Sequence, residues 1–282
     1  MNLKIRIKIS ISKRIQMLRN FKGYIETKHK KNEFDEKLNE ISSQFYEDQL
    51  QKYKKELINS VPLSCRVGES TSIHYDLLCK LKLNGFHPKR ILEIGFFRGF
   101  TSIFLRLLYP NSEIYSIELP EKELIRIKPL SKAKGGLIDH QNSYSEKFGI
   151  NLIRTNSVEI DSELGKFDLI WVDGNHSLPV AAIDVYNSIH LVGKNGIIMF
   201  DDFGFKELTF YKRQDDVADA YLALLPLFKK DTFLFKKTDE DVKFKDHPRM
   251  VAIYNAEKYL NLKKYLRLEN DAKFNFITER QA

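Results

Sequence analysis

The sequence predicts an α/β fold with a mostly parallel, seven-stranded sheet, helices on both of its faces and an N-terminal extension. From about residue 89 onward, short apolar runs alternate with segments of helical periodicity. That alternation is typical of parallel βαβ units with right-handed crossovers. The last two apolar runs, 231–236 and 250–255, are joined by a polar loop. We therefore expect these two strands to form an antiparallel pair at one edge of the sheet.

The individual elements follow from the apolar patterns along the chain. Strands are expected at 90–94, 113–118, 150–154, 167–172, 196–201, 231–236 and 250–255. Helices are expected near 101–108, 121–128, 157–164, 177–192, 213–228 and 256–266, and before the sheet within 35–60 and 71–84. We divide the chain into an N-terminal extension, 1–60, and an α/β domain, 61–282.

Composition bounds the class of protein. The chain has 282 residues, enough for one large domain with an extension. With only two cysteines, Cys65 and Cys79, a disulfide framework is excluded and a reducing compartment is expected. No apolar run is long enough to span a bilayer, and the basic N-terminus lacks the features of a signal peptide. The sequence thus predicts a cytoplasmic protein.

The net charge of +8 is concentrated at the N-terminus. Residues 1–31 contain ten lysines and arginines and a single acidic residue, whereas the other 251 residues contain 36 basic and 37 acidic residues. A nearly neutral body argues against an enzyme that grips nucleic acid with its catalytic face. Residues 3–11 alternate apolar and polar side chains like a half-buried strand. This basic arm either packs on a sheet edge or partner subunit, or contacts an anionic membrane surface or glycan.

A glycine turn follows the first core strand. The stretch from Glu93 to Gly99 has glycines at 95 and 99 and leads into an apolar helix. The two glycines let the backbone approach a ligand closely, and the helix offers unpaired N–H groups. The carboxylate of Glu93 would repel a pyrophosphate but suits a cationic ligand. The turn therefore favours S-adenosylmethionine (SAM) over a dinucleotide, the alternative being an ordinary tight turn.

Polar residues stand where the other strands end, and ligands of open α/β sheets bind at the carboxyl ends of the strands. Glu118 could take the hydroxyls of a ribose, or be a solvated acid at a strand end. Asn156 and Ser157 could reach an adenine edge or cap a helix. The fourth strand ends in Asp173-Gly-Asn-His176 and the fifth in Asp201-Asp202.

Taken in order, these residues resemble class I SAM-dependent methyltransferases over roughly 88–256. Within that class the chain is most similar to the macrocin and mycinamicin sugar O-methyltransferases, through Asp173-Gly174-Asn175-His176 and the Asp201-Asp202 pair. The resemblance implies a Rossmann-like methyltransferase sheet. It does not cover the first 60 residues or 121–149. The expected cofactor-binding residues are Glu93, Gly95, Phe96, Gly99, Thr101, Glu118, Asn156, Ser157 and Asp173.

Three carboxylates, those of Asp173, Asp201 and Asp202, are expected to converge at the mouth of the sheet. Like charges so close would repel one another unless a cation lay among them, and oxygen ligands favour Mg²⁺ or Mn²⁺. Such a metal would lower the pKa of a bound hydroxyl, and His176 could accept its proton. The alternative for the Asp pair and for Asp173-Gly174 is a polar turn. The prediction is metal-assisted O-methylation, with His176 and Asp173 as catalytic residues.

Two absent motifs argue against other functions. The chain lacks the Asn/Asp-Pro-Pro-Tyr motif of amino-group methyltransferases acting on DNA bases, which argues against that class. A nicotinamide dehydrogenase should show a third glycine in the turn after the first strand, and this chain has none there. A metal-independent small-molecule methyltransferase and a non-catalytic SAM-binding module remain as alternatives. Lysines and arginines within 121–149 hint at an anionic acceptor such as a sugar phosphate, although a solvated face is the simpler explanation. The sequence does not fix the acceptor, the need for metal or the oligomeric state.

Overall fold

The computed structural model describes residues 48–66, 73–127, 136–175, 180–203, 232–236 and 250–260. A seven-stranded sheet with the order β3-β2-β1-β4-β5-β7-β6 forms its centre. The first five strands pair in parallel, whereas β7 is antiparallel to both β5 and β6. The expected Rossmann-like methyltransferase fold, including the antiparallel pair at the edge, is confirmed.

The strands agree closely with the apolar runs that predicted them. They are β1 Arg90–Ile94, β2 Glu113–Glu118, β3 Ile150–Arg154, β4 Phe167–Val172, β5 Val192–Phe203, β6 Thr232–Lys236 and β7 Met250–Tyr254. Only β5 differs clearly, since it begins four residues before the predicted 196–201. Its extra residues pair with the start of β4 through a register shift between Phe167 and Leu169. The apolar run after Gly196 predicted the later part of β5, but nothing in the sequence indicated the irregular pairing at its start.

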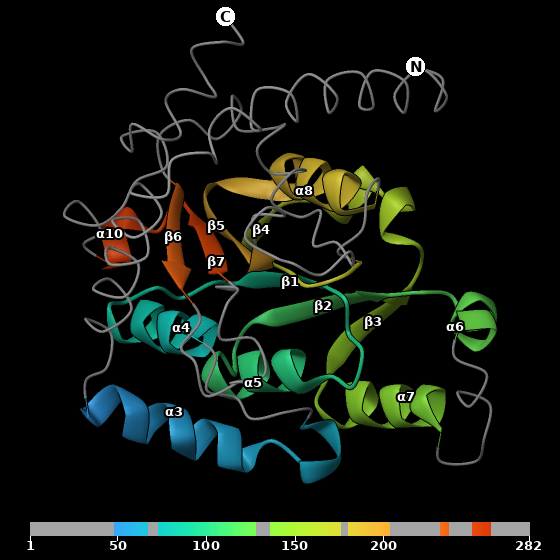
Figure 1. The fold of residues 1–282 in the computed structure, drawn as a ribbon, viewed down its shortest axis with the longest axis horizontal. Helices are drawn as coiled ribbons and strands as arrows, with labels where there is room; N and C mark the ends of the chain where they lie inside the picture. Colours follow the sequence, from blue (N-terminus) through green and yellow to red (C-terminus); the bar gives the residue numbers. More distant parts are fainter. Residues whose placement is uncertain are drawn as a thin grey trace, which may run out of the picture.

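Helices cover both faces of the sheet (Figure 1). The described helices are α3 Asp48–Ser60, α4 Ile73–Leu83, α5 Phe100–Leu108, α6 Glu121–Ile127, α7 Leu137–Lys147, α8 Val180–Leu191 and α10 Glu257–Leu260. Figure 1 shows α4, α5 and α7 on one side of the sheet, with α3 outermost, and α8 on the other. Short 3₁₀ turns lie at Leu63–Cys65, Ser157–Glu159 and Ser162–Leu164.

Two expectations about local structure were wrong. The predicted helix 157–164 consists of two separate 3₁₀ turns, because Ile160 between them has a ψ of 127°. The helix α7 lies between the expected helix 121–128 and the strand 150–154, where no helix was expected. Its buried residues are Ile138, Gln141 and Ser145. Their spacing is helical, but two of the three are polar, so no apolar stripe marked the helix.

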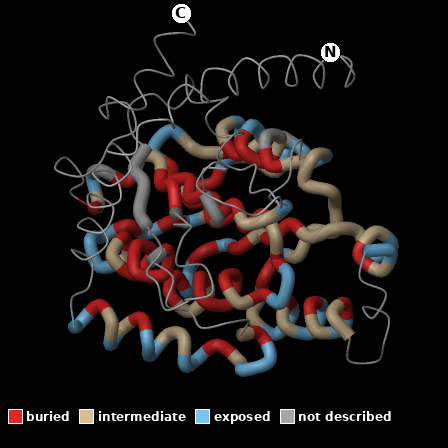
Figure 2. The backbone as a smooth tube through the Cα atoms, viewed as in Figure 1, coloured by how far each residue is buried: buried red, intermediate tan, exposed pale blue. Residues whose placement is uncertain are grey.

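The core lies against the sheet and the inner faces of α4 and α5 (Figure 2). Its largest fully buried side chains are Trp171, Phe96, Phe104, Phe167 and Phe200. The outer helix α3 contributes Leu50, which is 2% exposed. A buried ion pair, with Lys54 Nζ 2.7 Å from an oxygen of Asp76, also joins α3 to α4. The boundary drawn after residue 60 stays a prediction.

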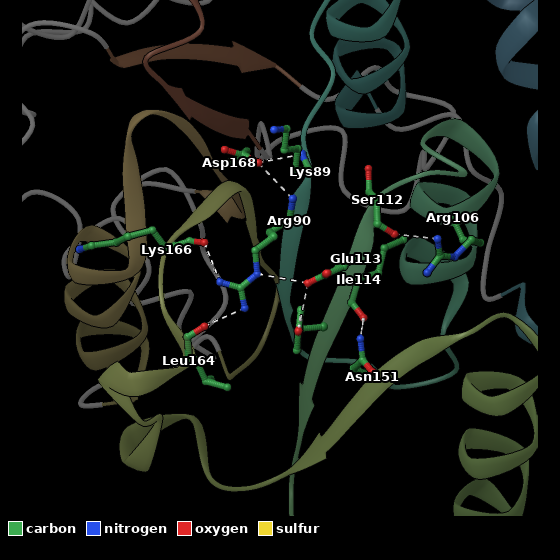
Figure 3. Close-up of polar contacts among 11 residues, drawn as sticks. Lys89, Arg90, Arg106, Ser112, Glu113, Ile114, Asn151, Leu164, Lys166 and Asp168 are labelled. Carbon is green, nitrogen blue, oxygen red and sulfur yellow. Dashed lines mark hydrogen bonds and ion pairs between the residues drawn. The ribbon is translucent and has the colours of Figure 1, made fainter.

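Polar contacts tie together the amino-terminal ends of the strands (Figure 3). The carboxylate of Asp168 accepts hydrogen bonds from the backbone N–H groups of Lys89 and Arg90, at 2.7 and 3.0 Å. The guanidinium of Arg90 donates to the carbonyls of Leu164 and Lys166, at 2.8 and 3.0 Å. These bonds join β1 to the loop before β4, so this end of the sheet is filled by its own side chains. The opposite end holds the site described next.

Several expectations fall outside the described residues. They are the basic arm at 1–31 with its strand 3–11, and the helix 213–228. The side chains of His176 and Asp202 also fall there. Among the described residues, no helix is long and apolar enough to cross a membrane.

Candidate functional site

A cavity of about 700 Å³ opens at the carboxyl ends of β1, β2 and β4. This is the position where open α/β sheets bind ligands, and the volume suits a cofactor-sized molecule. Eight of the nine predicted cofactor-binding residues line it: Glu93, Gly95, Phe96, Thr101, Glu118, Asn156, Ser157 and Asp173. The ninth, Gly99, is not part of the lining. The structure thus brings together residues from three strand ends, the first turn of α5 and the turn after β3.

The two glycines are required by the protein itself, which corrects the reason given for them from the sequence. Gly95 has a φ of 107°, and a Cβ there would lie 2.2 Å from the backbone oxygen of Asp173. Gly99 has a φ of 78°, and its Cβ would lie 2.6 Å from the ring of Phe96. Both positions therefore exclude a side chain through backbone strain and close packing. The glycines shape the cavity wall, but the space that a side chain would occupy at each position is already filled by other atoms of the protein.

Glu93 is a buried carboxyl group at the end of β1, 1% exposed. One of its oxygens accepts hydrogen bonds from the hydroxyls of Ser102 and Ser116, the latter at 2.7 Å. Burial is the main reason that the pKa of Glu93 is raised to about 8; the hydrogen bonds from the two serines oppose this shift, and the nearby carboxylates of Asp173 and Glu118 add to it. In the free protein this group therefore holds a proton at neutral pH. A cation in the cavity would favour its ionised form.

Binding of SAM is expected to release a proton from Glu93, because the cofactor's positive charge lowers the pKa of this group toward its ordinary value. Since the proton must leave, SAM affinity should rise with pH up to about 8, the pKa of Glu93 in the free protein, and level off above it. Calorimetry in buffers of different ionisation enthalpy measures the released proton. The variant Glu93→Gln should bind without that release, and an unchanged release would refute the assignment.

Glu118 is held in one orientation at the end of β2. Its Oε1 accepts from the backbone N–H of Leu119 at 2.9 Å, and its Oε2 accepts from the N–H of Phe97 at 2.8 Å. A carboxylate has about four acceptor positions, so some remain for a ligand. This arrangement suits the predicted contact with ribose hydroxyls, which stays a prediction.

Asn156 and Ser157 lie in the turn after β3. The Oδ1 of Asn156 accepts from the N–H of Val158 at 3.2 Å, so it caps the following 3₁₀ turn. The backbone oxygen of Ser157 accepts from the side chain of Asn187 on α8, at 2.8 Å. The capping alternative therefore holds for Asn156. Both residues nonetheless line the cavity, where their contact with an adenine edge stays a prediction.

The carboxylates expected to bind metal have different surroundings. Asp173 lines the cavity, and its backbone N–H donates to the carbonyl of Ile94 at 2.9 Å. Asp201, at 7% exposure, lies against α4, with an oxygen 3.8 Å from the Nδ1 of His74. Over the described ranges no group of three or more histidine, cysteine, aspartate or glutamate residues could hold a metal ion. The side chain of Asp202, the third expected ligand, lies outside the described residues, so the metal site stays a prediction.

Two residues next to the site were missed from the sequence, His74 and Tyr75 on α4. Tyr75 lines the cavity, and its hydroxyl shares a hydrogen bond with that of Thr101 at 3.2 Å. Burial, followed by the charges of Asp173, Asp201 and Glu93, raises the pKa of Tyr75 well above its usual range, so it is a neutral phenol. The ring centroid of His74 lies 4.7 Å from that of Trp171. These contacts link α4 to distant strand ends, which no local pattern reveals.

Residues 92–203 match the profile of a protein family described as "Methyltransferase domain". This segment is similar to a methyltransferase domain. It runs from β1 to the end of β5 and so includes all three strand ends that border the cavity. The expectation of a SAM-dependent methyltransferase from class I is confirmed at this level. The resemblance to the macrocin and mycinamicin group is not confirmed.

Solved structures similar to this chain include O-methyltransferases and an N-methyltransferase. A putative O-methyltransferase from Klebsiella pneumoniae is 15% identical, with a TM-score of 0.46 over 77% of this chain and 94% of that one. An O-methyltransferase from Bacillus cereus, in complex with SAH, is 14% identical, with a TM-score of 0.47 over 74% and 91%. The N-methyltransferase NodS from Bradyrhizobium japonicum is 14% identical, with a TM-score of 0.48 over 74% and 98%. Scores this low assign neither acceptor nor acceptor atom. Among curated proteins, a search with the chain finds no match.

Proposed function

We propose that this enzyme transfers the methyl group of SAM to a hydroxyl oxygen of a sugar or a related small metabolite. The observation that supports it most directly is one cavity lined by eight of the nine predicted cofactor residues. Within it, Glu118 would hold the ribose, while Glu93 and Asp173 would surround the positively charged part of the cofactor. The asparagine and serine after β3 would face the adenine.

The chemistry asks for orientation and proton removal. The sulfonium already activates the methyl group, so the enzyme mainly aligns the acceptor oxygen with it and takes up the hydroxyl proton. We assign His176, which stands three residues after Asp173 in the sequence, as the group that accepts this proton. Its imidazole accepts a proton near neutral pH. Asp173 is the alternative base, since it lies in the cavity wall.

The acceptor itself is proposed only as a class. Lys122 and Arg126, which hinted at an anionic acceptor, are exposed on α6 and do not line the cavity. A solvated face explains these two side chains. Incubation of metabolite mixtures with the enzyme and methyl-labelled SAM, followed by mass spectrometry, identifies the labelled product. Label appearing only on nitrogen or carbon would contradict O-methylation.

Metal assistance is part of the proposal, with Asp173, Asp201 and Asp202 as ligands of Mg²⁺ or Mn²⁺. When bound, the metal would lower the pKa of the acceptor hydroxyl. The supporting argument is the chemistry of the ligand set, because three oxygen donors favour a hard divalent cation. No geometry for it follows from the described side chains.

The variant Asp201→Asn is expected to lower methyl transfer and to raise the concentration of divalent metal needed for half-maximal rate. The amide is neutral and binds hard cations more weakly than a carboxylate does. Transfer rates are measured across a series of Mg²⁺ and Mn²⁺ concentrations after treatment with EDTA. Full activity of the parent in excess EDTA would contradict metal assistance.

A specific observation favours the metal-independent alternative. The Nδ1 of His74 lies 3.8 Å from Asp201, so a protonated imidazole could balance the charge of that carboxylate. Under this alternative His74→Gln, and not removal of metal, should lower the rate of transfer. The same EDTA series therefore decides between the two versions of the proposal.

A further inference from the structure

A buried amide lies directly behind the carboxylate of Glu118. Gln141, on α7, is 0% exposed. Its Nε2 donates to the backbone oxygen of Phe97 at 2.7 Å and to Oε2 of Glu118 at 3.1 Å. Its Oε1 accepts from the guanidinium of Arg154, at the end of β3, at 2.6 Å. One side chain thus connects α7 with the ends of β2 and β3 and with the glycine turn.

The chemistry of its neighbours fixes which way this amide points. A guanidinium can only donate, so the amide oxygen must face Arg154. A carbonyl and a carboxylate can only accept, so the NH₂ group must face Phe97 and Glu118. A flipped amide would lose all three hydrogen bonds. Gln141 is therefore locked, and each of its polar atoms has a matching partner.

The backbone that Gln141 holds is strained. Phe97 is a non-glycine residue with a φ of 46°, a conformation that costs about 1–3 kcal/mol and persists only when its surroundings enforce it. Its ring is 41% exposed, so hydrophobic burial holds it weakly. Its N–H donates to Glu118 at 2.8 Å and its carbonyl accepts from Gln141 at 2.7 Å. The turn is fastened on both sides of this one residue.

We propose that Gln141 is a positioning residue for the cofactor ribose. It acts through Glu118, and the inference rests on the proposed role of Glu118 in binding that ribose. The donors Phe97, Leu119 and Gln141 together use three of about four acceptor positions of the carboxylate. Glu118 therefore cannot rotate, and it presents its remaining capacity to the cavity that it lines in a single orientation. Such pre-organisation increases affinity by lowering the ordering cost of binding.

The test compares two ligands, S-adenosylhomocysteine (SAH) and its 2′,3′-dideoxy analogue, which lacks the ribose hydroxyls. Two variants keep the size of the side chain. Gln141→Met removes all three hydrogen bonds, and Gln141→Glu keeps only the hydrogen bond that Arg154 donates. Asn142→Ala is the matched control, because the side chain of Asn142 accepts from the same Arg154 at 2.8 Å but is not among the hydrogen-bond partners described above for Glu118 and Phe97. Calorimetry gives each dissociation constant, and thermal unfolding of the free proteins confirms that each variant is folded.

For both Gln141 variants, the affinity for SAH should fall by roughly 10- to 100-fold, the usual effect of removing a residue that orients a ligand-binding group. The affinity for the dideoxy analogue should hardly change, and Asn142→Ala should match the parent with both ligands. Equal losses for the two ligands would overturn the inference, since Gln141 would then be structural alone. A parent protein that binds both ligands equally would instead refute the ribose role of Glu118, and the inference with it.

Discussion

Replacing Gly95 by alanine is expected to unfold the site and to lower the free energy of unfolding by about 3 kcal/mol or more. The added Cβ would lie 2.2 Å from the backbone oxygen of Asp173, at a position where φ is already 107°. The close contact is with a backbone atom and the strain lies in the backbone of residue 95, so no side-chain rotation relieves either of them. The carbonyl that would have to move belongs to the turn after β4, which lines the cavity. SAM binding should therefore be lost together with stability.

Gly85→Ala is the matched control. Gly85 has a φ of 84°, but nothing lies within 4 Å of the Cβ that alanine would add. Its free energy of unfolding should fall only by the cost of placing alanine in a left-handed backbone conformation, about 1–2 kcal/mol, and SAM binding should be kept. Denaturant unfolding of both variants and calorimetry with SAM measure the difference. Similar losses at the two positions would show that the contact with Asp173 does not matter.

Replacing His176 by alanine should lower turnover by roughly 10²–10⁴-fold, the usual contribution of a positioned base, with SAM affinity little changed. The parent's rate should fall as the pH drops through the ordinary imidazole range, because a protonated ring cannot accept the hydroxyl proton. Steady-state rates and pH profiles measure both effects. His87→Ala, which removes an exposed ring at the opposite end of the sheet, serves as the control. A flat profile from pH 5.5 to 8 would favour Asp173 as the base.

The strands could be predicted because each is a short apolar run, and burial on both faces of a parallel sheet requires such runs. The helix α7 could not, because its inward residues include Gln141 and Ser145, whose partners are polar. A polar residue that faces a hydrogen-bond network looks, in the sequence, like one that faces water. The same property that hid α7 makes it useful, since Gln141 reaches the carboxylate of Glu118.

The cavity residues could be predicted because a parallel sheet gathers its carboxyl ends at one edge, so reading the strand ends in order amounts to reading a place in space. His74 and Tyr75 follow no such rule. They precede the sheet, and α4 brings them to the site from outside the strand order. The role of Gly95 was also hidden, since the atom that excludes its side chain belongs to Asp173, far along the chain.

The ion pair between α3 and α4 has a practical consequence for anyone who shortens this protein. A gene fragment that starts at residue 61, where the extension was predicted to end, would lack Lys54 and Gln51. Both hold one oxygen of Asp76, a carboxyl group that is 0% exposed. Without them its charge would have no counter-ion in the interior, which is strongly destabilising. Soluble expression therefore calls for fragments that begin ahead of Asp48 and retain the whole outer helix.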